Sequence, residues 1–233
     1  MQIRRTAALL VALSGLFALA AAAYAAPIGV YRNGMGSEAQ RAQVVKLSGD
    51  RCKRGGSEQA LRVMIGKRTS ECSYRTPVVG RDLEIATTAR LLSATPKPLL
   101  NKAFLAVSLR AGGAGAHYQL AVYPLQRKAQ LRRTLNDGRT EYLRIEKDVA
   151  AVKGVNQANE LRLHAFNVTS GADKGSCHIL AFVGAQLIAD VTDAASGELE
   201  GRASGFSVGA KGAAKGIVGS FDDVVVRVPN PFE

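Results

Sequence analysis

The stretch from Gly201 to Phe232 constrains the fold more than any other part of the chain. It contains two short runs, GFSVGA and SFDDVVVRV, joined by a segment rich in glycine, alanine and lysine. The second run is rich in β-branched residues, and Pro229 and Pro231 follow it, which is the pattern of a strand that ends at proline. Its nearly continuous apolar character is typical of a strand packed inside a sandwich. The stretch therefore predicts an all-β protein.

Further strand signals recur along the chain at short intervals. Between Asp82 and Leu92 alternate residues are apolar or small, which is the period of a strand with one buried face. Other predicted strands are 60–65, 103–109, 117–123, 129–134, 140–145, 159–166, 177–183 and 186–191. The pair around Asn136-Asp137-Gly138 and the pair around Gly184-Ala185 have the turns of hairpins. About a dozen short strands predict a two-sheet antiparallel β-sandwich of the jelly-roll type.

The first part of the mature chain gives weaker signals. Residues 26–36 are predicted as a polar lead, and residues 49–57 as a polar, basic loop. The segment from Ser37 to Leu47 fits either a short helix that begins after Ser37 as N-cap or the first strand of the sheet.

Residues 1–25 have the organisation of a secretory signal peptide. Arg4 and Arg5 precede an apolar run, and Ala23-Tyr24-Ala25 has the small-x-small pattern of a cleavage site. The apolar run is short for a membrane-spanning helix, so we expect cleavage after Ala25 rather than an anchor. The prediction is a single mature domain, residues 26–233, that is secreted or associated with the cell envelope and not inserted in the membrane.

The chain is strongly basic, with a formal net charge of +12. Removal of Arg4 and Arg5 leaves 12 − 2 = +10. Basic residues gather in 41–75 and 127–144, and most such clusters are simply solvated surface. The alternative is attraction to a polyanion, such as an acidic polysaccharide or a phosphate-rich envelope polymer. No nucleic-acid-binding motif accompanies the charge, so we expect no nucleic-acid partner.

The three cysteines fit a secreted protein, because an oxidising compartment permits disulfides. Cys52 and Cys72 flank a segment that is predicted as a hairpin, with ALRVMIG in one arm and CSYRT near the other. We therefore predict a Cys52–Cys72 disulfide and a free, buried Cys177. The three histidines have no zinc-like spacing with the cysteines.

The motifs NELRLHAF, CHILAFVGAQLIADVTDA, GRASGFSVGA and GSFDDVVVRV occur in an order that resembles the end of the concanavalin A-like lectin/glucanase superfamily, in its laminin-G-like form. The greatest similarity is to secreted bacterial 3-keto-disaccharide hydrolase-like domains, and HYQLAVY with QLRR extends it. The resemblance implies a concanavalin A-like jelly roll. It also implies a calcium ligand at Asp222, the first Asp of the closing "F-D-D" strand; the alternative is that Asp222 only caps a neighbouring segment.

The sequence departs from the catalytic pattern of this superfamily. It has no Trp, and Ala129 stands where the family often has one. The "E-x-D-x-x-E" strand of the glucanase branch has no counterpart, and the odd separation of Glu141 and Glu146 predicts that they face opposite sides of a strand. Acids that could form a pair from separate strands are Asp82, Glu84, Glu141 and Asp190.

Aromatic rings with polar neighbours are typical of sugar-binding surfaces. Tyr118 and Tyr123 have odd separation, so one is expected in the core, with Tyr123 exposed beside His117 and Gln119. The candidate ligand-binding residues are Tyr123, His117, Gln119, His164 and Arg132.

Three functions are compatible with these observations. The preferred one is a secreted, non-catalytic module that binds glycan or an anionic cell-envelope polymer. The second is a glycoside hydrolase of the 3-keto-disaccharide hydrolase-like type, and the third is a structural or protein-interaction domain. No cofactor is expected beyond the calcium ion that the resemblance implies.

Overall fold

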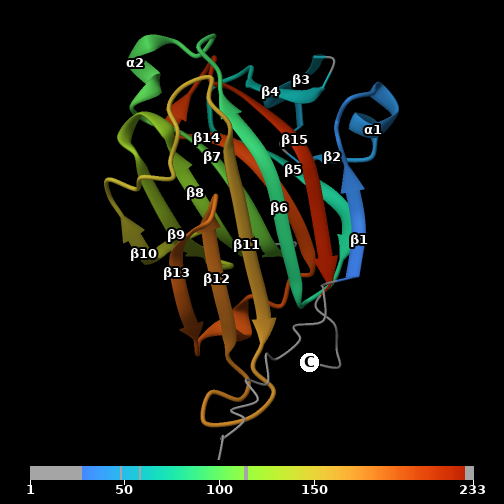
Figure 1. Cartoon of the computed structure of the whole chain (residues 1–233), viewed down its shortest axis with the longest axis vertical. Helices are drawn as coiled ribbons and strands as arrows, with labels where there is room; N and C mark the ends of the chain where they lie inside the picture. Colours follow the sequence, from blue (N-terminus) through green and yellow to red (C-terminus); the bar gives the residue numbers. More distant parts are fainter. Residues whose placement is uncertain (1–27, 48, 58, 113–114, 229–233) are drawn as a thin grey trace, which may run out of the picture.

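The computed structural model describes residues 28–47, 49–57, 59–112 and 115–228. Its strands form two antiparallel sheets that pack face to face as a β-sandwich, with one sheet in front of the other in Figure 1. The fold is the jelly roll that the sequence predicts. The predicted signal peptide, residues 1–25, lies outside the described residues.

Each sheet combines strands that are far apart in the sequence. Sheet A contains, in spatial order, β13 (Gln186–Asp193), β12 (Cys177–Val183), β11 (Asn159–Asn167), β6 (Leu83–Leu91), β15 (Val218–Val228), β4 (Ala60–Ile65) and β3 (Cys52–Ser57), and β1 (Ile28–Asn33) also pairs with β15. Sheet B contains, in spatial order, β10 (Thr140–Glu146), β9 (Lys128–Thr134), β8 (His117–Tyr123), β7 (Ala103–Ala111), β14 (Ala203–Ala214), β5 (Thr69–Val79) and β2 (Val45–Lys46).

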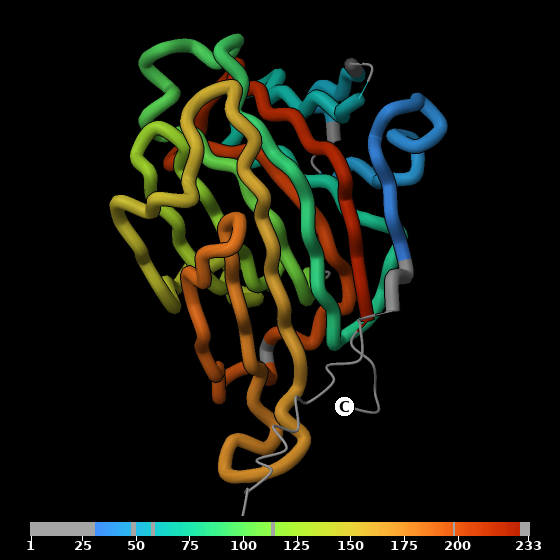
Figure 2. Tube along the Cα trace, viewed as in Figure 1, coloured from blue at the N-terminus to red at the C-terminus, as the bar shows by residue number. Residues whose placement is uncertain are grey.

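The chain crosses repeatedly between the sheets, as the tube in Figure 2 allows the reader to follow. The two closing strands β14 and β15 lie in different sheets. The predicted hairpins β9–β10 and β12–β13 are confirmed. The predicted hairpin of β4 and β5 is wrong, because β4 pairs with β3 and β15 whereas β5 pairs with β14 and β2. The segment between β4 and β5 is therefore a crossover from sheet A to sheet B.

The hydrophobic core lies between the two sheets. The predicted inward face of β6 is confirmed, since its alternate side chains are buried: Leu83, Ile85, Thr87, Ala89 and Leu91. Three aromatic rings fill the centre, with Tyr74 stacked on Phe206 at 5.9 Å between ring centroids and Phe206 against Phe221 at 4.7 Å. Aromatic pairs at such distances add to the free energy gained from burial.

The predicted disulfide between Cys52 and Cys72 is present, with 5.7 Å between the Cα atoms. Cys52 lies on β3 and Cys72 on β5, so the bond joins sheet A to sheet B. Closing a loop of this length stabilises the fold by ~3 kcal/mol in the chain-entropy description. Cys177 is free and buried, as predicted, and burial raises the pKa of its thiol to about 11.

Helices are short. Ser37 caps α1 (Glu38–Ala42), and its hydroxyl accepts a hydrogen bond from the backbone N–H of Gln40 in a reciprocal capping box. The other helices are α2 (Lys97–Leu100) and the 3-10 turns η1 (Gly49–Arg51), η2 (Pro124–Gln126) and η3 (Ser196–Glu198). In the described part of the chain, no helix has the length and apolar character that a membrane crossing requires.

Two sequence predictions for the first part of the chain are wrong. The expected polar lead contains β1, and the expected basic loop contains β3. Both strands lie at the periphery of sheet A, where solvent-exposed polar side chains are tolerated, so neither carries the apolar alternation of a central strand.

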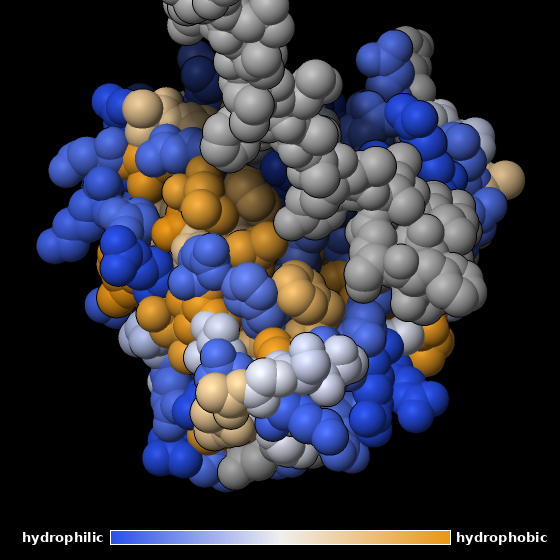
Figure 3. All heavy atoms as spheres, turned by 60° about the horizontal axis from the view of Figure 1, so that its bottom comes forward, coloured by the Kyte–Doolittle hydropathy of each residue, from blue (hydrophilic) through white to orange (hydrophobic). Residues whose placement is uncertain are grey.

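At the end of the sandwich that lies at the bottom of Figure 1, hydrophilic side chains surround an apolar area (Figure 3). The surface features that bear on function lie on the outer faces of the two sheets, which carry the side chains that point away from the core.

Candidate functional site

The outer face of sheet B contains a small apolar cluster that is separate from the main core. Phe104 and Ala106 on β7 and Ala121 and Tyr123 on β8 form this cluster. The rings of Phe104 and Tyr123 lie 5.5 Å apart between centroids. A Cβ atom on Gly209 would come within 2.2 Å of the Phe104 ring, so glycine at this position of β14 makes room for it. The cluster forms an aromatic floor on this face.

A polar network lies beside this floor and joins three strands. Gln119 on β8 donates from Nε2 to Oε1 of Glu71 on β5, at 2.7 Å. Arg132 on β9 donates from Nε to Oε1 of Gln119, also at 2.7 Å, and a second nitrogen of the guanidinium contacts the same oxygen. Arg132 Nη2 lies 3.6 Å from Oε2 of Glu71. Because Gln119 is only 1% exposed, the network holds the acid and the guanidinium in fixed positions.

Two cations cover the aromatic floor. The Arg132 guanidinium lies 4.8 Å from the centroid of the Phe104 ring, and Lys128 Nζ lies 4.0 Å from that of Tyr123. Burial raises the pKa of Tyr123. Burial lowers the pKa of Lys128, and so do the charges of two neighbouring lysines, Lys211 and Lys147.

Two further side chains on the same face, Gln130 and Tyr142, differ in their exposure. Gln130, which lies between Lys128 and Arg132 on β9, is 7% exposed, and its Oε1 has no hydrogen-bond partner. Tyr142 pairs with Arg132 across the β9–β10 hairpin and is 54% exposed. The Gln130 oxygen is therefore a buried acceptor without a partner, which is energetically unfavourable, whereas the Tyr142 ring is the group on this face that a ligand can reach.

The structure brings together most of the residues that the sequence nominated. Gln119, Arg132, Tyr123 and His117 all lie on the outer face of sheet B, since β8 and β9 pair in register there. Tyr118 faces the core, where its hydroxyl donates to Asp193 at 2.7 Å. Tyr123 lies on the opposite face, as predicted, but it is 4% exposed rather than open to solvent, because Phe104 and Lys128 cover it.

Sequence reasoning missed Glu71. It lies in TSECSYRTPVV, where Cys72, Tyr74 and Thr76 are buried and the residues between them point outward. That alternation was a usable signal. His164, in contrast, lies on sheet A and takes no part in the site on sheet B.

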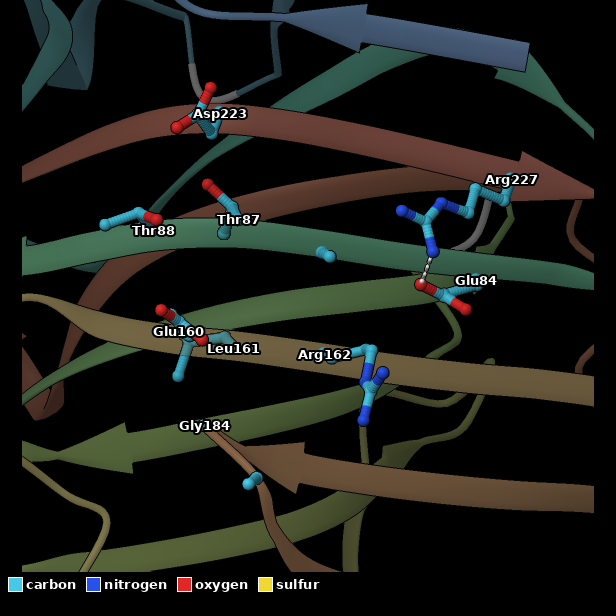
Figure 4. A pocket seen from close by; sticks show the side chains of 11 residues that line it. Glu84, Thr87, Thr88, Glu160, Leu161, Arg162, Gly184, Asp223 and Arg227 are labelled. Carbon is cyan, nitrogen blue, oxygen red and sulfur yellow. Dashed lines mark hydrogen bonds and ion pairs between the residues drawn. The ribbon is translucent and has the colours of Figure 1, made fainter. Parts of the chain in front are cut away.

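The outer face of sheet A carries a broad, shallow groove of about 430 Å³ over β15, β6 and β11 (Figure 4). Glu84, which is 4% exposed, lies 3.2 Å from His164 and 3.4 Å from Arg227. Arg162 lies near Glu84 in Figure 4, and its guanidinium lies 4.2 Å from the Phe182 ring centroid. Burial lowers the pKa of His164, against the opposing effect of Glu84.

The acids proposed for a catalytic pair are each held by a different basic side chain. Their shortest distances to a basic side chain are Asp82 to Arg110 at 3.5 Å, Glu84 to His164 at 3.2 Å, Glu141 to Arg133 at 2.6 Å and Asp190 to His178 at 2.6 Å. The expectation that Glu141 and Glu146 face opposite sides of β10 is wrong. A register shift between Tyr142 and Arg144 places them opposite Arg133 and Ala129, which share one face of β9.

The surroundings of Asp222 do not favour calcium. Its Oδ1 accepts a hydrogen bond from the backbone N–H of Asp223, and Arg62 and Arg90 line the same depression. Calcium is bound by about six to eight oxygen ligands, and cations beside the carboxylate oppose this. Within the described ranges, no group of three or more His, Cys, Asp or Glu side chains could hold a metal ion.

Similarity to known proteins is found by comparison of structures and not by comparison of sequences. No protein family model and no curated protein sequence matches the chain. The carbohydrate-binding module CBM66 from Bacillus subtilis has a TM-score of 0.56 and 11% identity, over 79% of this chain and 95% of that one. The potassium-bound carbohydrate recognition domain of Emp46p has a TM-score of 0.57 and 13% identity, over 84% of this chain and 94% of that one.

One enzyme is as similar in structure to this chain as the two carbohydrate-binding domains are. The Bacillus licheniformis β-glucanase has a TM-score of 0.56 and 10% identity, over 87% of this chain and 99% of that one. At such low identity the likeness concerns the fold and leaves the activity open. The described chain shares with these proteins the fold of a two-sheet antiparallel jelly roll.

Proposed function

We propose that this chain is a secreted, non-catalytic module that binds a glycan or an anionic cell-envelope polymer on the outer face of sheet B. The observation that carries the proposal is the Glu71–Gln119–Arg132 network beside the aromatic floor of Phe104 and Tyr123. Sugars present hydroxyl groups around apolar ring faces, and this surface offers fixed polar groups next to the exposed ring of Tyr142, above the buried floor.

The distribution of carboxylates supports binding rather than hydrolysis. On β5, β14, β7, β8 and β9 of sheet B, Glu71 is the one carboxylate that points outward. Glu141 and Glu146 on β10 pair with Arg133 and Ala129, on the opposite face of β9 from Arg132. Glycoside hydrolysis in its usual form uses two carboxyl groups about 5–10 Å apart. Glu71 is also committed to Arg132 and Gln119.

The positive charge beside the aromatic floor supports the proposal that the ligand is an anionic glycan or polymer. Lys128 is close enough to Lys147 and Lys211 for their charges to lower its pKa, and none of the three forms an ion pair with a described carboxylate. A ligand carboxylate or phosphate would relieve this repulsion. Secretion, in this proposal, rests on the leader sequence of residues 1–25.

Names of similar structures support glycan binding in general, because CBM66 and the Emp46p domain are named for carbohydrate binding or recognition. The structural similarity to a β-glucanase supports the alternative function, a glycoside hydrolase of the 3-keto-disaccharide hydrolase-like type. The experiment must therefore separate binding from cleavage.

Affinity electrophoresis of the mature chain in gels that contain alginate, an acidic polysaccharide, or laminarin, a neutral glucan, tests the proposal. Tyr142→Ala removes an exposed ring beside Arg132 and is expected to weaken binding about tenfold, equivalent to ~1.4 kcal/mol. Leu187→Ala, at an equally exposed apolar position on sheet A, is the matched control and is expected to bind normally. Retention on alginate should also weaken with added salt.

Two outcomes would overturn the proposal. Release of sugar from laminarin or a disaccharide substrate that Glu71→Gln abolishes would establish the hydrolase alternative. Absence of both binding and cleavage across a broad glycan panel would leave the protein-interaction alternative.

A further inference from the structure

A row of three polar side chains crosses the outer face of sheet A near the β3 edge. Ser220 on β15 pairs with Arg62 on β4 on one side and with Arg90 on β6 on the other. Residues paired across antiparallel strands point to the same face, and the neighbours of both arginines along their strands are buried in the core. The two guanidinium groups therefore extend from strands on either side of Ser220.

The row lies in a depression separate from the groove at Glu84. Its volume is about 250 Å³, and Arg62, Arg90, Ser220 and Asp222 line it together with Gln59. Ser220 is 5% exposed, which places it at the floor, whereas Arg62 is exposed at the rim.

The depression has an excess of positive charge. Neither arginine forms an ion pair with a described carboxylate. Asp222 is the one acid among the lining residues, so two guanidinium charges face one carboxylate. Lys53 on β3 pairs with Met64, two residues beyond Arg62 on the same face of β4, and extends the basic surface.

Such a set of donors suits an oxyanion with several accepting oxygens. Guanidinium groups donate paired, charge-assisted hydrogen bonds to phosphate and sulfate. The strands of Arg62 and Arg90 lie two strand spacings apart, about 10 Å, so long side chains can converge over the serine between them. The serine hydroxyl adds a donor at the floor.

We propose that this depression binds a tetrahedral oxyanion, the phosphate or sulfate group of an anionic polymer, between Arg62 and Arg90. The site is on the opposite sheet from the glycan surface of sheet B. Its occupancy therefore does not depend on that surface, and the two proposals can fail separately.

Isothermal titration of the mature chain with inorganic phosphate and inorganic sulfate, and elution from immobilised polyphosphate and heparin, tests the proposal. The Arg62→Gln/Arg90→Gln double variant is expected to lose at least tenfold in affinity for the anion that binds. Asp222→Asn removes the opposing charge and is expected to bind several-fold more tightly. The two polymers distinguish the source, since polyphosphate carries phosphate and heparin carries sulfate.

Lys174→Gln is the matched control, because it removes one positive charge from an exposed turn between β11 and β12, away from the depression. It should change affinity by less than twofold. If Lys174→Gln loses as much affinity for the anion as the double variant does, the binding is non-specific electrostatic attraction and the proposal is wrong. Unchanged binding by the double variant, or weaker binding by Asp222→Asn, would also overturn it. If Arg90→Gln impairs folding, the exposed Arg62→Gln alone carries the test, with a several-fold loss expected.

Discussion

The outer faces of the two sheets are built on different principles. On sheet B, Phe104 is 2% exposed and Gln119 1% exposed, although both point away from the core. Neighbouring side chains of the same face cover them, and the polar groups are fixed by one another. On sheet A, charges pair across adjacent strands, as Glu84 does with Arg227, and leave an open groove. The first face is a second small core with polar groups at its edge, whereas the second is an open groove lined by paired charges.

This difference predicts unequal consequences when one aromatic ring is removed from each face. Phe104→Ala is expected to lower the free energy of unfolding by about 3–5 kcal/mol, the usual range for a buried phenylalanine. Phe182→Ala, at a half-buried position under Arg162, is expected to lower it by only about 1 kcal/mol. Urea denaturation of both variants measures the two values. Equal losses would show that the sheet B face is no more core-like than the sheet A face.

The next largest effect should come from the polar network on sheet B. Gln119→Leu keeps the size of the side chain but leaves Glu71 and Arg132 without their shared partner, so we expect a loss of about 1–3 kcal/mol in the free energy of unfolding. Thr88→Val on the groove of sheet A is the matched polar-to-apolar control and should stay within about 0.5 kcal/mol. If Gln119→Leu left the free energy of unfolding unchanged, the hydrogen bonds of Gln119 would not be what holds Glu71 and Arg132 in place.

The individual strands of the two sheets were predicted from the sequence more accurately than the way in which the strands pair. Alternation along β6 and β8 correctly predicted which residues face the core, because that information is local. The assignment of β4 and β5 to different sheets was missed, since a short connection between two strands usually means a hairpin. The polar strands β1 and β3 were missed because edge positions do not demand an apolar face.

The site itself depended on contacts that are distant in sequence. Glu71, Gln119 and Arg132 lie on β5, β8 and β9, and β14 and β7 separate the first strand from the second. Only the register of five strands places these side chains side by side. Gln119 and Arg132 were named from their strands, but their hydrogen bond to each other and the part of Glu71 could not be read from local pattern.

A smaller effect is expected from pH on the sheet A face. His164 is surrounded by Glu84, Arg162, Arg227 and the Phe182 ring, and burial lowers its pKa in the folded protein. The unfolded chain, with a histidine pKa of about 6.5, then binds more protons, so the free energy of unfolding should fall as the pH drops below about 6.5. The fall levels off below the folded-state pKa.

Urea denaturation between pH 7.5 and pH 5 measures this contribution. His164→Gln should flatten the pH dependence. A steeper dependence in His164→Gln would contradict the assigned direction of the pKa shift.

The smallest effect is expected from calcium removal. Excess EGTA should leave the melting temperature unchanged, because Arg62 and Arg90 flank Asp222 and its carboxylate already accepts a backbone hydrogen bond. A bound ion would stabilise the folded state by mass action, so its loss would lower the melting temperature. Asp222→Asn sharpens the choice between cation and anion in this depression. It should abolish any stabilisation by added calcium if Asp222 is a ligand, but increase stabilisation by added phosphate or sulfate if the arginines hold an oxyanion. A melting temperature that falls with EGTA in the wild type and not in Asp222→Asn would favour the metal and count against the anion.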